Sequence, residues 1–159
     1  MWKMNENVSQ GTPDEHFTFL SKGARFQGVV NCEGTVRVDG MLNGEITTNG
    51  TLIIGEQGRI RGTILVGTLT VSGGTITGSA GISDAGAFNW SGGTVTTTGA
   101  ATLTTTGATN VTGAVTLGRD WTAGPGATVN LNGAGDVSIS AGKTLTLRSE
   151  EHTSELQSR

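Results

Sequence analysis

Two consecutive segments of this chain, residues 35–50 and 51–67, repeat one pattern, and this repeat restricts the fold more than any other feature. The segments read TVRVDGMLNGEITTNG and TLIIGEQGRIRGTILVG. Apolar residues alternate with polar ones in both, and glycines separate the short alternating runs. Alternation with a period of two predicts β-strands, and the glycines predict corners. Units of this length are too short for a helical hairpin and match one coil of an all-β, single-stack β-solenoid.

Alignment of the two units predicts which side chains point into the solenoid. Equivalent positions of successive coils lie above one another, so apolar residues at matching positions should form inward ladders. The charged neighbours Arg37, Asp39, Glu45 and Arg61 should point outward, as a solvated face with ion pairs between coils. The predicted inward residues are Val36, Val38, Leu42, Ile46, Leu52, Ile54, Ile60 and Ile64.

The second half of the chain continues the coils with a different composition. Residues 66–147 contain five charged side chains, whereas residues 1–65 contain 13. The phrase beginning at Leu69, LTVSGGTIT, recurs at Phe88 as FNWSGGTVT. This places Trp90 where Val71 lies one coil earlier, so Trp90 should fill the core. The chain has 27 glycines and 27 threonines, which favour corners and strands.

Several functional classes are disfavoured by the sequence. A net charge of −3 is unsuited to a nucleic-acid surface, which needs clustered Lys and Arg. No window has the 18 apolar residues of a membrane span, and the N-terminus lacks the apolar core of a signal peptide. The single cysteine and the scattered acidic residues provide no metal site, cofactor site, catalytic residues or small-molecule substrate site.

The solenoid ends are the candidate functional surface. End coils expose unpaired backbone groups and an open apolar core, which pair with another copy unless they are covered. Phe17 and Phe19 share one face and are expected to cap the core or to dock. With Val29, Val30 and Cys32 they form the predicted polymerisation surface at the N-terminal end, Cys32 being a small core residue.

Four segments are expected along the chain. Residues 1–16 should be a disordered tail, 17–67 and 68–147 one continuous stack of coils, and 148–159 a non-native tail outside the folded body. Met1, Trp2, Lys3 and Met4 form a candidate contact with a lipid headgroup layer, which is too small to hold a monomer and becomes effective in a polymer.

The phrases EGTVRVDGMLNGEI and GTLIIGEQGRIRGTI, within Phe19–Ile64, resemble the bactofilin core. This resemblance implies a cytoplasmic bacterial cytoskeletal protein: a right-handed, roughly three-sided β-helix that polymerises end to end without nucleotide, often at the inner membrane. Residues 68–147 resemble Gly/Thr-rich adhesin or autotransporter coils, and Arg148–Ser158 resembles a translated sequencing adapter. The favoured function is therefore a non-enzymatic structural scaffold. The alternatives are a fragment of a secreted surface adhesin and an artificial join of two genes near residues 64–68.

Overall fold

A computed structural model describes residues 17–148 and the backbone of residues 153–157, and these residues form strands and no helix. The tail predicted for residues 1–16 lies outside the described residues, as does the candidate lipid contact. The strands are β1 (Phe17–Leu20), β2 (Arg25–Cys32), β3 (Thr35–Val38), β4 (Met41–Ile54), β5 (Arg59–Thr77), β6 (Ile82–Asp84), β7 (Phe88–Thr96), β8 (Leu103–Thr105), β9 (Ala108–Val111), β10 (Ala114–Gly118), β11 (Trp121–Ala123), β12 (Thr128–Leu131), β13 (Asp136–Ile139), β14 (Thr144–Arg148) and β15 (Thr153–Gln157).

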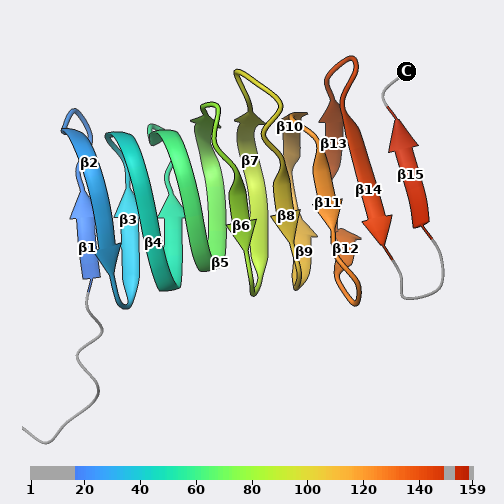
Figure 1. Cartoon of the computed structure of the whole chain (residues 1–159), viewed down its shortest axis with the longest axis horizontal. Coiled ribbons are helices and arrows are strands. Elements are labelled where there is room, and N and C mark those ends of the chain that lie inside the picture. Colours follow the sequence, from blue (N-terminus) through green and yellow to red (C-terminus); the bar gives the residue numbers. More distant parts are fainter. Residues whose placement is uncertain (1–16, 149–152, 158–159) are drawn as a thin grey trace, which may run out of the picture.

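The strands wind into a β-solenoid of about seven turns, as the repeat predicts (Figure 1). Strands of successive coils pair in parallel and form three stacks, which we call faces A, B and C. Face A comprises β1, β3, residues 51–54, 68–71 and 88–90, β9 and β12. Face B comprises residues 25–28, 41–44, 59–62, 75–77 and 94–96, β10 and β13. Face C comprises residues 29–32, 45–48 and 63–66, β6, β8, β11, β14 and β15.

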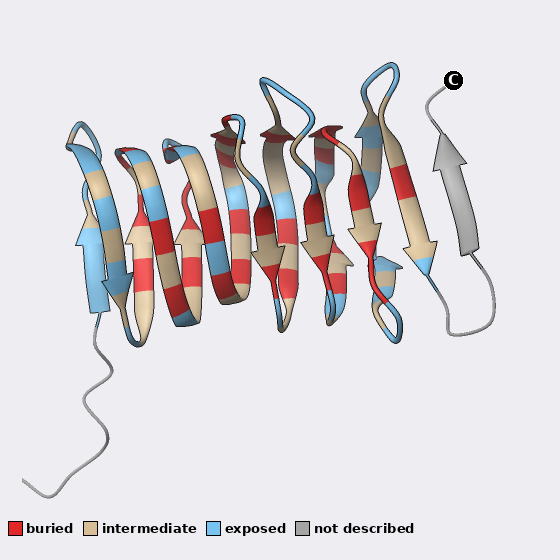
Figure 2. Cartoon of the chain, in the orientation of Figure 1, coloured by how far each residue is buried: buried red, intermediate tan, exposed pale blue. Residues whose placement is uncertain are grey.

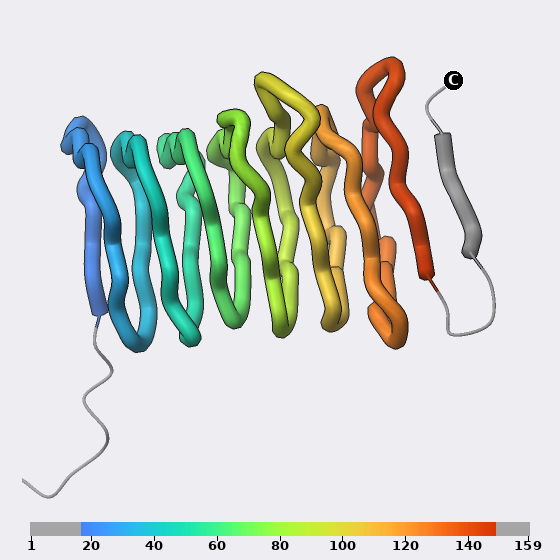
Figure 3. The backbone as a smooth tube through the Cα atoms, in the orientation of Figure 1, coloured from blue at the N-terminus to red at the C-terminus, as the bar shows by residue number. Residues whose placement is uncertain are grey.

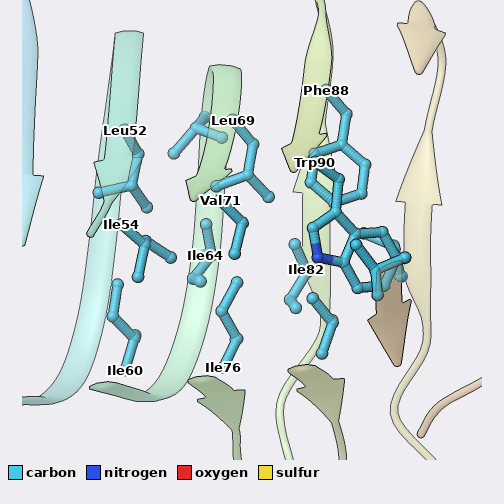
Figure 4. Packing of buried hydrophobic residues seen from close by; sticks show 14 of the residues in the cluster. Leu52, Ile54, Ile60, Ile64, Leu69, Val71, Ile76, Ile82, Phe88 and Trp90 are labelled. Carbon is cyan, nitrogen blue, oxygen red and sulfur yellow. The ribbon is translucent and has the colours of Figure 1, made fainter. Parts of the chain in front are cut away.

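The predicted coil register is confirmed. Val36 pairs with Leu52, and Leu52 pairs with Leu69, so their side chains stack along the inside of face A. All eight predicted ladder residues are at most 2% exposed. Figure 4 shows the ladders from Leu52 to Phe88 and from Ile54 to Trp90. The expected outward residues Glu45 and Arg61 are exposed, and Arg37 and Asp39 are half-buried.

Glycine is required at the corner between faces B and C. Gly28, Gly44 and Gly62 pair with one another in successive coils, with φ values of 142°, 148° and 148°. L side chains rarely adopt this conformation. A Cβ on Gly44 would also overlap the Gly28 carbonyl oxygen. The coils can therefore approach to strand-pairing distance only because this corner has no side chains.

The coils become longer and less regular in the second half. The register between β5 and β7 shifts around Ser72, and loops project at the upper corners in Figure 3, one of them near residue 100 and another near residue 140. Aromatic side chains fill the interior at this level. The ring centroids of Phe88 and Trp90 are 5.3 Å apart, and those of Trp90 and Trp121 are 6.3 Å apart. Trp90 pairs with Val71 and is 1% exposed, which confirms its predicted core position.

Residues 148–159 were expected to lie outside the folded body. This expectation is wrong for residues 153–157, whose backbone forms β15. Residues 153–157 pair with β14 in the one antiparallel pairing among the described strands. Residues 149–152 and 158–159 lie outside the described part of the chain. An antiparallel strand can form here because the open edge of β14 offers backbone donors and acceptors to any extended segment that reaches it.

Candidate polymerisation surface

The first coil leaves one edge of every face open at the N-terminal end. Among the described strands, β1 pairs only with β3, and β2 pairs only with β4. Because β2 contributes to both face B and face C, all three stacks end in a strand whose outer edge has no partner within residues 17–148 or 153–157. Figure 2 shows this coil as mostly exposed, in contrast to the buried centre of the molecule. Backbone donors and acceptors on such edges favour pairing with a further strand.

Phe17 and Phe19 do not cover the open core, contrary to one of the expectations from sequence. Phe17 pairs with Thr35 and Phe19 with Arg37, and those positions point out of face A. The two rings stack on each other with centroids 6.5 Å apart and remain 59% and 53% exposed. The alternation of β1 explains this placement, because Leu20 pairs with Val38 and so occupies the inward position instead.

The other predicted residues of this end divide between the two sides of β2. Val30 and Cys32 continue inward ladders, since they pair with Ile46 and Thr48, and both pack partly against the core. Val29 pairs with Glu45 on the outer side of face C and is 67% exposed.

Two inward residues at this end were missed. Leu20 packs against the core, and Phe26 pairs with buried Leu42 while remaining 38% exposed. Extending the repeat alignment one coil towards the N-terminus, FQGVV over LNGEI, would have identified Phe26. The end of the apolar interior is therefore formed by Leu20, Phe26, Val30 and Cys32, with Phe17, Phe19 and Val29 at its rim.

The C-terminal end is only partly open. Among the described strands, β12 pairs only with β9 and β13 only with β10, so faces A and B have free edges. On face C, β15 pairs with all five residues of β14. Leu131, which is 59% exposed, lies on the free edge of face A. The two ends therefore differ. At the C-terminal end β15 covers the edge of face C, whereas at the N-terminal end no described strand covers any of the three faces.

The outer faces of the described coils hold several open hollows. The described residues include no group of three or more His, Cys, Asp or Glu placed to hold a metal ion. The single ion pair in this part of the chain joins Arg37 Nε of β3 to Asp39 Oδ2 in the bend after that strand, at 2.7 Å, and so lies within one coil rather than between coils as expected. It raises the pKa of Arg37 through the hydrogen bond and charge of Asp39. One hollow of about 270 Å³ lies beside Lys22, Arg25 and Arg59.

Two charged residues are buried inside the solenoid, and the sequence patterns did not indicate either. Asp84 lies in an inward ladder of face C between Val66 and Thr105 and is 0% exposed. Neither of its carboxylate oxygens has a hydrogen-bond partner of normal geometry. Burial raises the pKa of Asp84 to about 6, and the nearby Leu69 amide opposes part of that rise.

Arg119 is the second buried charge and lies at a corner between faces B and C. Its Nε donates to the Thr96 carbonyl at 3.0 Å and its Nη1 to the Ala80 carbonyl at 3.2 Å. Burial lowers the pKa of Arg119 to about 10. The side chain therefore ties two earlier coils together through their backbone carbonyls, which is a structural role.

Comparison with known proteins assigns the family. The family model for bactofilin, described as polymer-forming cytoskeletal, matches residues 18–130. The match extends well beyond Ile64, where the resemblance recognised from sequence ended, and crosses the join considered near residues 64–68. It gives no support to the adhesin-like alternative for the Gly/Thr-rich coils. Searches of curated proteins and of solved structures return no match. Because the matched region covers most of the coils, this chain belongs to the bactofilin family of polymer-forming, non-enzymatic cytoskeletal proteins.

Proposed function

We propose that this bactofilin forms filaments end to end without nucleotide and that the N-terminal coil is one docking surface. The observation that carries the proposal is the open edge on all three stacks at this end. Docking would pair these edges and complete the partly buried ladders that end at Leu20, Phe26, Val30 and Cys32. Phe17, Phe19 and Val29 would contact the partner at the rim. Self-polymerisation is the property that membership of the family implies.

A charge at the end of an inward ladder should prevent docking. Phe26→Glu places a carboxylate where the apolar interior of two copies would meet, and burying it unpaired is costly. We expect sedimentation and negative-stain microscopy to show filaments for the unaltered protein, with or without ATP or GTP, and none for Phe26→Glu. Phe19→Glu is the matched control, since its outward position should weaken docking less. Strictly monomeric unaltered protein at tens of micromolar would contradict the proposal.

The N-terminal tail provides a second part of the proposal, a peripheral contact with the inner face of the cytoplasmic membrane. Among the described residues no helix is long and apolar enough to cross a bilayer. Met1, Trp2, Lys3 and Met4 would insert shallowly, and a filament would present many copies of this weak anchor. Filaments should co-sediment with lipid vesicles, and deletion of residues 1–4 should abolish binding while leaving filament formation intact. Equal binding by the truncated protein would exclude this anchor.

A further inference from the structure

One corner between faces A and B is shorter than the corners before and after it. Residues 21–24 and 55–58 form corners of four residues, whereas the coil between them turns with residues 39–40 alone. Each long corner is closed by a backbone hydrogen bond across its four residues, of 3.0 Å in the first and 2.9 Å in the second. The long corners therefore form the two walls of a notch above the short corner.

The floor of this notch has no side chain. It is formed by buried Gly40, where a Cβ would come within 2.5 Å of the carbonyl oxygens of Ser21 and Ala24. The space above this glycine is a hollow of about 270 Å³. This volume is near the lower end of the range for small-ligand sites, so the hollow suits one small molecule.

Three cations border the hollow. Lys22 lies on one wall, and Arg25 and Arg59 lie on face B on either side of Met41, with which each of them pairs. Neighbouring strands are about 4.8 Å apart, so the Cα atoms of the two arginines are separated by about 10 Å. Arginine side chains are long enough at this separation for both to contact one group held above Met41.

The positive charge of this hollow is not compensated within the described residues. The single ion pair of residues 17–148 joins Arg37 to Asp39, which is the one described acidic residue lining the hollow. The hollow is thus lined by three cations and one carboxylate, and that carboxylate is already paired. An adjoining hollow of about 410 Å³ also contains Glu56 and is lined by two cations and two carboxylates. An anion is therefore favoured in the first hollow and not in the second.

We propose that this notch binds a phosphate group, with the guanidinium groups of Arg25 and Arg59 on two sides of it and the Lys22 ammonium group on a third. Guanidinium is the side-chain group that best matches the paired oxygens of a phosphate, and hydrogen bonds between charged groups are stronger than neutral ones. A diphosphate carries more charge than one phosphate and would contact both arginines at once. This binding is a property of the single chain and does not depend on end-to-end docking.

Equilibrium dialysis against labelled pyrophosphate at low ionic strength tests the site, whether or not the chain is polymerised. The unaltered protein should bind one pyrophosphate per chain. Arg25→Gln and Arg59→Gln should each weaken binding by about tenfold, because each removes a charge-assisted contact. Arg61→Gln is the matched control and should bind as the unaltered protein does. Arg61 is exposed on the same strand as Arg59 and has the same charge, but it does not line the hollow.

Substitution of Met41 tests the position of the phosphate without removing a cation. Met41→Glu places a carboxylate between the two arginines, where it would pair with them, and should abolish binding. Met41→Gln is its uncharged control and should retain binding to within about threefold. Met41 is 37% exposed, so neither change disturbs the core.

A phosphate group can belong to a soluble diphosphate compound or to a lipid headgroup, and a second assay distinguishes these sources. Flotation with vesicles of phosphatidylglycerol and phosphatidylethanolamine is measured for a chain that lacks residues 1–4. Flotation that is lost in Arg25→Gln and Arg59→Gln, without pyrophosphate binding, would assign the phosphate to a lipid. Pyrophosphate binding without flotation would assign it to a soluble compound. Saturable binding of neither probe, or an equal loss of affinity in Arg61→Gln and Arg59→Gln, would overturn the proposal and leave the proposed filament untouched.

Discussion

Asp84 should make this protein less stable as the pH rises towards neutrality, the reverse of ordinary acid denaturation. Its carboxyl group occupies an apolar ladder position, 0% exposed, with Val66 before it and Thr105 after it. The folded-state pKa is raised from 3.8 to about 6. The protonated form is therefore favoured in the folded state. Its contribution to stability is complete below pH 3.8 and is lost as the pH rises through about 6.

The size of this effect follows from the pKa shift. A rise from 3.8 to about 6 corresponds to about 3 kcal/mol of unfolding free energy between the acid and neutral limits. Asp84→Asn removes the ionisation while keeping nearly the same volume. The variant should therefore exceed the unaltered protein in stability by about 2–3 kcal/mol at pH 7.5 and match it closely near pH 4.

Urea unfolding monitored by fluorescence of the buried tryptophans measures this difference. Trp90 and Trp121 are at most 1% exposed, so unfolding transfers both rings to water. The measurements should be made in a Phe26→Glu background, which is expected to prevent polymerisation from contributing to the apparent stability. Asp84→Val, which extends the ladder from Val66, is a second variant. An equal pH dependence in Asp84→Asn and the unaltered protein would refute the assignment of this effect to Asp84.

Four further predictions concern the core, the corners and the C-terminal edge. Leu52→Ala should lower the unfolding free energy by about 2–5 kcal/mol in denaturant titrations, whereas Arg37→Ala should change it far less, because the ion pair of Arg37 with Asp39 lies at the surface. Gly44→Ala should cost more than about 1 kcal/mol by the same assay, since its φ and the coil spacing both exclude a side chain. Trp121→Phe removes the Nε1 hydrogen bond of 3.0 Å to Thr105 and should cost about 1–3 kcal/mol. Deletion of residues 149–159 should uncover the face C edge of β14 and lengthen filaments seen by microscopy.

Sequence periodicity was sufficient to predict the fold and the core register. Alternation between apolar and polar residues, repeated at matching positions, is a direct consequence of strands stacked above one another. It therefore predicted the pairing of Val36 with Leu52 and of Val71 with Trp90. It also predicted that the coils continue across residues 67 and 68, where β5 runs without interruption.

Periodicity did not predict the inward positions that hold polar side chains instead of apolar ones. Asp84 occupies an apolar position, and Thr109 is also buried at an inward position, below Phe88. The buried position of Asp84 becomes visible only from the strand pairing. Residues 82–84 (ISD) pair with residues 64–66 of the preceding coil and with residues 103–105 of the following coil. For Phe17 and Phe19 the sequence left two positions open, a cap over the core and a docking surface, and the pairing of β1 excludes the cap because it directs both rings outward.

The C-terminal strand shows why a lack of side-chain periodicity does not keep a segment out of a sheet. The segment after Arg148 lacks the alternation of the coils, and its likeness to a translated adapter remains a prediction. Its backbone nevertheless pairs along all of β14, because ladder hydrogen bonds involve main-chain groups that every non-proline residue has. Only antiparallel pairing was open to it, since the connection of four residues, 149–152, is too short for the crossover that parallel strands need. The same argument applies to the ends as docking surfaces. An open edge can pair with any extended backbone, so the apolar side chains at the ladder ends, Leu20 and Phe26, must supply the preference for another copy of this chain.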